Sequence, residues 1–171
     1  MPATGQFSPS QVKMENMTHA ERQVAIQKIA ALPAQLEALV AGRADSDLNK
    51  NYGPGKWTAR QVIHHLADSH IHSFIRMRYI ATTDNPTIQP YDQDEWAKLP
   101  DACTGPIEPS LEILKGAHAR WAAFLRALPE EAFTRTGFHP ERGTVSLDDL
   151  VRIYAGHGEK HLGHIRTAFN S

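Results

Sequence analysis

Apolar residues recur along this chain at intervals of three and four positions, the spacing that places side chains on one face of an α-helix. Four segments show the pattern, and they span about residues 18–41, 59–82, 110–128 and 147–169. Amphipathic helices of this length bury their apolar faces by packing against one another. The pattern therefore predicts an all-α protein with the architecture of an up-down four-helix bundle.

Three of these segments begin with a capping box, in which two side chains three residues apart bond the free backbone N–H groups at a helix start. The pairs are Thr18 with Glu21, Thr58 with Gln61, and Ser146 with Asp149. Pro33 interrupts the first segment, because proline has no N–H to donate and clashes with the preceding turn. We therefore expect a kink or break near residues 31–33, after which the helix resumes to about Ala41 and stops at Gly42.

The connections between the segments differ in length. Residues 83–107 are rich in turn-forming residues and predict a long crossover loop between the second and third helices. Residues 130–147 fit a short hairpin before the last helix, and a plain loop fits nearly as well. Residues 1–17 lack a clear period and are expected to form an extended N-terminal lead-in, so that residues 18–171 make a single domain.

Composition narrows the classes of function. The chain has 171 residues, and its 41% hydrophobic and 22% charged residues are those of an ordinary globular protein. A net charge of −1 creates no field that would attract nucleic acid or an anionic membrane. The single cysteine, Cys103, allows no internal disulfide and fits a reducing compartment, so we expect a cytoplasmic protein.

Histidines supply the candidate chemistry. His157 and His161 stand four residues apart, so on a helix both imidazoles can reach one metal ion. A solvated helix end rich in histidine is the alternative, but a second cluster lies in the second predicted helix, at His64, His65, His70 and His72. We choose His65 as the third ligand because it lies on the core-facing stripe of that helix, whereas His64 is turned about 100° away.

Three neutral imidazoles leave a fourth position for water, which is typical of catalytic zinc sites and not of structural ones. A zinc protease would place its glutamate directly after the first histidine, and here Glu159 follows His157 by two positions, so we reject that class. Asp68 could accept the other ring N–H of His65, and His164 could act as a nearby acid or base or as a packing residue. His72 could line the site, and a polar or anionic substrate could be oriented by Arg76, Arg78, Tyr91, His118 and Arg120, although each has a structural alternative.

The motifs also give the chain a family resemblance, from about Gly5 to its end. The segments that carry it are Gly55-Lys-Trp57-Thr-Ala-Arg-Gln-Val-Ile-His-His65-Leu-Ala-Asp-Ser-His70, Pro90-Tyr91-Asp92, His118-Ala-Arg120-Trp121, His139-Pro-Glu141 and His157-Gly-Glu-Lys-His161. On these residues the chain resembles the DinB/YfiT-like superfamily, and within it the YfiT-type metal-dependent hydrolases. The resemblance implies a bundle that commonly dimerises and one divalent ion, zinc or nickel, on His65, His157 and His161. Gly156 and Gly158 depart from it, because bulkier residues are expected there.

Three functions follow as hypotheses. The first is a hydrolase of a small-molecule substrate that uses water activated by the metal. The second, which the resemblance also implies, is a thiol S-transferase whose metal binds a low-molecular-weight thiol such as bacillithiol or mycothiol. The third is a non-enzymatic metal-binding stress or interaction module, which would show an exposed apolar patch and no pocket above the metal.

Overall fold

Four long helices build the protein, as the sequence predicts. The structure is a computed structural model that describes residues 15–171, so the expected lead-in lies outside the described residues up to position 14. The helices are α1 (His19–Val40), α3 (Ala59–Thr82), α6 (Glu108–Ala127) and α7 (Leu147–Phe169). Their ends agree with the predicted segments to within two residues, and all three capping boxes are present. The four-helix bundle is therefore confirmed.

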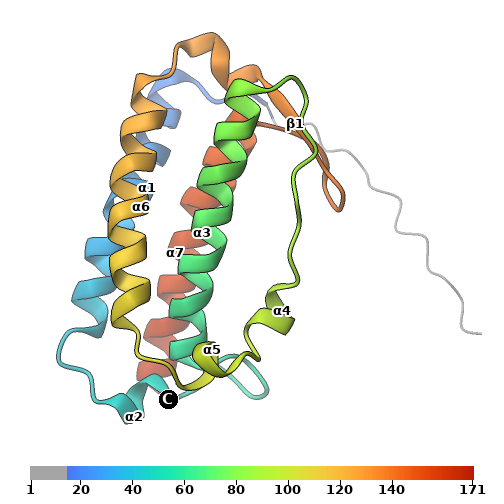
Figure 1. Cartoon of the computed structure of the whole chain (residues 1–171). Helices are drawn as coiled ribbons and strands as arrows, with labels where there is room; N and C mark the ends of the chain where they lie inside the picture. Colours follow the sequence, from blue (N-terminus) through green and yellow to red (C-terminus); the bar gives the residue numbers. More distant parts are fainter. Residues whose placement is uncertain (1–14) are drawn as a thin grey trace, which may run out of the picture.

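The order of the helices around the bundle differs from their order in the chain. α1 and α3 each pack against both α6 and α7, so α1 lies diagonally opposite α3 (Figure 1). After α3 the chain returns along the outside of the bundle through α4 (Gln93–Trp96) and α5 (Pro100–Thr104). This predicted crossover brings the chain back to the end where α3 began, so α3 and α6 run in the same direction.

A short hairpin precedes the last helix, which decides between the two alternatives left by the sequence. After a 3-10 turn, η1 (Glu130–Thr134), strand β1 (Thr136–His139) pairs in antiparallel fashion with β2 (Gly143–Ser146). The backbone of Phe138 bonds the crossover on both sides, donating to Pro86 at 2.9 Å and accepting from Ile88 at 2.8 Å. The hairpin and the start of the crossover are thereby held together, and both border the site described below.

The expected break in the first helix is wrong, because α1 continues through Pro33 to Val40. Proline leaves the carbonyl oxygen four residues earlier, that of Ile29, without its usual N–H partner. Nδ1 of His118 on α6 lies 2.6 Å from that oxygen. A side chain of a neighbouring helix thus replaces the missing helical bond. Before α3 the chain also forms a short helix, α2 (Asp45–Leu48), in the connection that follows α1.

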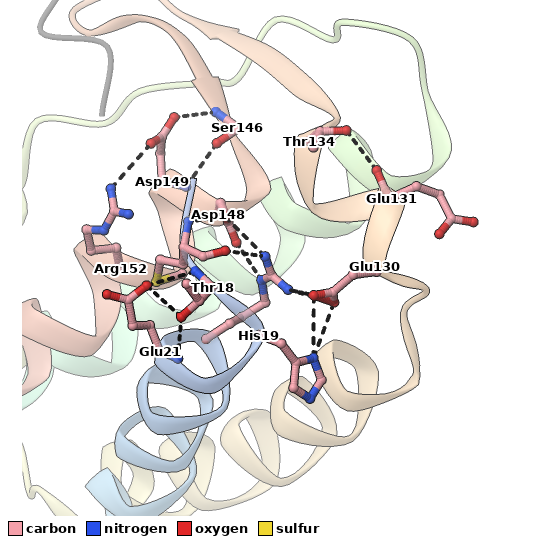
Figure 2. A network of polar contacts seen from close by, with 12 residues as sticks. Thr18, His19, Glu21, Glu130, Glu131, Thr134, Ser146, Asp148, Asp149 and Arg152 are labelled. Atoms are coloured by element: carbon pink, nitrogen blue, oxygen red, sulfur yellow. Dashed lines mark hydrogen bonds and ion pairs between the residues drawn. The ribbon is translucent and has the colours of Figure 1, made fainter. Parts of the chain in front are cut away.

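A buried ion pair joins the starts of α1 and α7. Nε of Arg22 donates to Asp148 at 2.6 Å, and both side chains are almost fully buried. Asp148 also accepts from the backbone N–H of Met17 at 2.8 Å. The exposed Glu130 is a second partner of the Arg22 guanidinium (Figure 2). Met17 is buried, so the predicted lead-in already belongs to the folded domain at that residue.

The apolar core divides into two clusters along the bundle, with histidines between them. On α3, Leu66 belongs to one cluster and Phe74 to the other, and the fully buried His70 lies between them. On α6, His118 likewise lies between Leu114 of one cluster and Trp121 of the other. Polar groups in such a layer must be paired, because a buried group without a partner is costly. Among the described residues, no helix combines the length and hydropathy of a membrane span.

Candidate metal centre

The structure brings the three predicted ligands together midway along the bundle. Nε2 of His157 lies 3.3 Å from Nε2 of His65 and 3.1 Å from Nε2 of His161. One ring nitrogen from each of the three lies within 4.8 Å of the others. In a tetrahedral zinc site with Zn–N bonds of about 2.0–2.1 Å, ligand nitrogens are separated by roughly 3.3 Å. The three residues therefore fit a divalent ion, although their role as ligands stays a prediction.

These imidazoles are neutral at physiological pH. Burial lowers the pKa of His65 from 6.5 to about 4 and, with help from nearby positive charge, the pKa of His157 to about 3. Burial likewise lowers the pKa of His161. Because only a neutral imidazole has a lone pair to donate, the site is prepared for a metal without first losing protons.

The second ring nitrogens of the three residues have different surroundings. Nδ1 of His65 lies 3.5 Å from the hydroxyl of Tyr91, which takes the place predicted for Asp68. The Asp68 side chain forms no hydrogen bond among residues 15–171, and its backbone carbonyl binds His72 instead. Nδ1 of His157 lies 3.0 Å from Nε2 of His70, whereas Nδ1 of His161 is buried without a partner among the described residues.

A cavity of about 820 Å³ opens beside this cluster, with His157 and His161 in its wall. It is formed by segments far apart in the sequence: the loop before α3, the middle of α3, the crossover, the hairpin turn and α7. Its basic side chains are Lys56, Arg76, Arg142 and Lys160, and its acidic ones are Asp92, Asp94 and Glu141. The cavity is large enough for a small-molecule substrate.

The predicted substrate-binding residues divide into two groups. Arg76 and Tyr91 line the cavity, and their role in substrate binding stays a prediction. His72 does not, because it stacks on the outer side of the site against Tyr91, with ring centroids 4.5 Å apart. Arg78 and Arg120 are also outside it, with guanidinium groups 5.5 and 5.7 Å from the centre of a phenyl ring. The structure therefore places neither His72 nor Arg120 in the cavity wall, and their roles in substrate binding stay predictions.

The structure also places three other residues that the sequence singled out: His118, Glu159 and His164. His118 is 1% exposed and lies in the core, so it cannot touch a substrate. Glu159 pairs with Lys28 at 3.0 Å on the bundle surface, as its spacing from His157 predicts. His164 lines the cavity and stacks on Tyr52, with ring centroids 4.1 Å apart. Its proposed role as an acid or base stays a prediction.

Several residues of the site were missed by sequence reasoning. His70 was grouped with its neighbours but given no role, and it contacts His157 directly. His139 lies in the cavity wall and is 6% exposed, close to Arg142 of the hairpin turn. The motif His139-Pro-Glu141 was a signal for this second group, but nothing in its spacing showed that the hairpin would fold toward the metal centre.

Four long helices with a cluster of three histidines beside a cavity define the class of this protein. Comparison with known proteins gives the family. The sequence profile of the DinB superfamily matches residues 28–165, and the chain belongs to this superfamily. It is 45% identical over 142 residues to a protein of Oceanobacillus iheyensis, an alignment that covers 83% of this chain and 82% of the relative.

A second relative, YfiT of Bacillus subtilis, is 36% identical over 162 residues, covering 94% of this chain and 89% of that protein. Both relatives carry the name "putative metal-dependent hydrolase". The solved structure of YfiT superposes with a TM-score of 0.88 over 96% of this chain and 92% of that one. It is described as having "an unusual four-helix bundle topology".

Proposed function

We propose that this protein is a hydrolase of a small molecule, with a divalent ion held by His65, His157 and His161. The observation that carries the proposal is that Nε2 of His157 lies 3.3 Å from Nε2 of His65 and 3.1 Å from Nε2 of His161, with His157 and His161 in the wall of a cavity. When bound, an ion with an open position supplies Lewis acidity that lowers the pKa of a water molecule there. Zinc or nickel suits three imidazole ligands.

Neutral donors in the cavity wall would orient the substrate. Burial raises the pKa of Tyr91 to about 12, so its hydroxyl stays protonated and can donate a hydrogen bond beside His65. Burial and the charge of Arg76 lower the pKa of His139, whose Nδ1 accepts from the backbone N–H of Glu141 at 3.2 Å. A neutral His139 therefore carries its proton on Nε2 and offers a second donor.

The charges of the cavity favour an anionic substrate. Lys56, Arg142 and Lys160 form no ion pair with any described residue, so their charges are available to a ligand. Lys160 and Arg142 also help to lower the pKa of His157, which shows that their field reaches the metal centre. A carboxylate or phosphate group on the substrate would bind between these cations while the bond to be cleaved lies near the histidines.

A thiol S-transferase is the second candidate, and the size of the cavity favours it. About 820 Å³ has room for a low-molecular-weight thiol beside a second substrate. The same ion would lower the pKa of the thiol instead of that of water. The third hypothesis, a binding module without a pocket at the metal, does not agree with this cavity.

The first experiment is elemental analysis of the purified protein beside two variants. We expect one divalent ion per chain in the wild type, none in His157→Ala, and an unchanged content in His164→Ala, because His164 lies in the cavity wall outside the triple. Equal metal content in all three proteins, or none in the wild type, would exclude the proposed site.

The second experiment separates the two reactions. Ester and amide substrates that carry a carboxylate are tested with the metal-loaded and the chelator-treated enzyme, and low-molecular-weight thiols are titrated into cobalt-substituted protein. Metal-dependent hydrolysis with no thiol-induced change in the cobalt spectrum supports the hydrolase. A thiol-dependent change without hydrolysis of any substrate overturns it in favour of S-transfer.

A further inference from the structure

A line of hydrogen bonds runs from the metal centre into the core, on the side away from the cavity. Nδ1 of His157 lies 3.0 Å from Nε2 of His70, and Nδ1 of His70 lies 3.0 Å from Nε2 of His118. Nδ1 of His118 ends the line at the carbonyl oxygen of Ile29, 2.6 Å away. His70 and His118 are 0% and 1% exposed, and neither lines the cavity. They contact no substrate, so their role lies elsewhere.

The end of this line is available because of Pro33. In an unbroken α-helix the N–H of residue 33 would bond the carbonyl of Ile29, but proline has no N–H. α1 therefore presents a backbone acceptor to α6 in the middle of the bundle. His118 meets it at a short distance, which fixes the position of the ring as well as that of the proton.

The direction of every bond in the line follows from this acceptor. A carbonyl oxygen only accepts, so Nδ1 of His118 carries the proton and its Nε2 is left as an acceptor. His70 must then donate from Nδ1 and accept at Nε2, and His157 must donate from Nδ1. A charged imidazole in the line would be costly, since the described residues place no carboxylate against either buried ring. The lone pair of His157 is thereby left on Nε2, the nitrogen that faces the other two ligands.

We propose that His70 and His118 are positioning residues, which lock His157 in the tautomer and ring orientation that present Nε2 to the metal. Metal-binding histidines usually donate their other N–H to a carboxylate, a carbonyl or water. Here the acceptor is a backbone carbonyl reached through two further imidazoles. The line adds no negative charge, so the ion keeps its full electrostatic pull on an anionic ligand. The inference rests on the proposed metal site.

The three ligands should therefore differ in preorganisation. His157 has the complete line behind it, whereas His65 has only the long contact of Nδ1 with Tyr91 at 3.5 Å. Nδ1 of His161 has no partner among the described residues. In the metal-free protein we expect one fixed tautomer for His157 and for both residues behind it.

The test is a two-bond ¹H–¹⁵N NMR correlation on chelator-treated, full-length protein labelled with ¹⁵N-histidine. We expect the Nδ1–H tautomer for His157, His70 and His118 before any metal is added. The Nε2–H tautomer at His157, or a mixture of both forms, would overturn the proposal. Because this measurement needs no metal and no variant, its failure is distinct from failure of the proposed function, which elemental analysis decides.

Metal affinity gives the second readout, measured as Co²⁺ binding and Zn²⁺ competition. His70→Phe fills a similar space but removes the acceptor for His157, and we expect affinity about 10- to 100-fold weaker. His118→Phe should weaken binding as well, and His118→Gln should restore part of it, because an amide offers both a donor and an acceptor. The control is His64→Phe. In the wild type the His64 ring bonds Ser110 at 2.8 Å and lies outside the line, so metal affinity should not change. Unchanged affinity in folded His70→Phe would contradict the proposal, and if that variant does not fold, the wild-type tautomers decide.

Discussion

At the scale of single residues, Asp148 is a buried polar group that joins α1 to α7 outside the candidate metal centre. It is 2% exposed and accepts from both the Arg22 guanidinium and the backbone N–H of Met17. Replacing Asp148 by Ala leaves a buried guanidinium without its buried anionic partner, a change that costs about 3–5 kcal/mol in comparable buried pairs. We expect a loss of this size in the free energy of unfolding, measured by urea denaturation.

Glu130 provides the matched control for Asp148, because it binds the same guanidinium at 2.6 Å while its side chain is 55% exposed. Exposed ion pairs contribute about 0–1 kcal/mol. Glu130→Ala should therefore shift the urea midpoint only slightly. Equal losses in the two variants would show that burial does not decide the strength of this network.

Among the candidate ligands, His65 could be chosen from geometry within one helix. The choice of His65 over His64 followed from the helical turn alone, and the structure places His64 against Ser110 instead. The same reasoning could not assign His70, because its role depends on His118 of another helix and on a carbonyl freed by Pro33. The spacing of residues within one helix does not predict which residues of another helix they will contact.

At the scale of elements, Gly158 explains how closely α7 approaches α1. A Cβ atom at this position would lie 3.1 and 3.2 Å from the two methyl carbons of Leu32, which is itself 2% exposed. From the sequence, Gly158 was only a departure from the family resemblance, with no structural reason for it. The structure shows that a bulkier residue, expected from the family resemblance, would have to displace a packed side chain one turn from the metal centre.

Two alanine substitutions in α7 test this close approach. Gly156→Ala meets nothing within 4 Å and should stabilise the protein by up to about 1 kcal/mol through helix propensity. Gly158→Ala gains the same propensity but must push Leu32, and crowding a packed core typically costs about 1–3 kcal/mol. We expect a lower thermal midpoint for Gly158→Ala than for Gly156→Ala. The opposite order would mean that Leu32 yields at little cost.

Element boundaries were predictable because the capping boxes are local. Thr58, for example, needs only Gln61 to start α3 at the predicted residue. The break expected at Pro33 was wrong for the opposite reason, since the lost bond is replaced from α6. The hairpin stayed undecided in the sequence because part of its support is the backbone pairing of Phe138 with the crossover, 50 residues earlier.

At the scale of the whole molecule, the cavity was the least predictable feature. Its wall combines α3 and α7 with the hairpin turn and the crossover, and the pattern of apolar residues in one element says nothing about where the others fold. The crossover was expected from its length, but the diagonal placement of α1 and α3 was not. Helical spacing selected His65, His157 and His161, and the family resemblance implied the same three residues, whereas composition indicated only the abundance of histidine.

Metal binding should stabilise the entire fold, because the three ligands come from two helices and are separated when the chain unfolds. An ion at 100 times its dissociation constant adds about 2.7 kcal/mol to the free energy of unfolding. We expect chelator treatment to lower the thermal midpoint of the wild type and added Zn²⁺ to restore it. His157→Ala should show no such response, and a response of the same size in that variant would place the ion elsewhere.

The metal-free protein should lose stability in mild acid because of the same buried imidazoles. Burial holds the pKa of His65 at about 4 and of His157 at about 3 in the folded chain, against 6.5 for an ordinary histidine. As the pH falls below 6.5, these histidines bind protons in the unfolded chain but not in the folded chain, so the free energy of unfolding decreases. Each such histidine contributes up to about 1.4 kcal/mol per pH unit, and above pH 6.5 the contribution is complete.

Urea denaturation of chelator-treated protein between pH 6.5 and 5 measures this slope, in a window where most carboxylates remain ionised. His157→Gln removes one titrating group at the same place in the bundle, and its slope should be smaller by up to about 1.4 kcal/mol per pH unit. Identical slopes in the two proteins would mean that His157 takes up its proton in the folded state at an ordinary pH. A smaller slope in the variant would tie acid sensitivity to the buried histidine layer, the same layer that prepares the site for its ion.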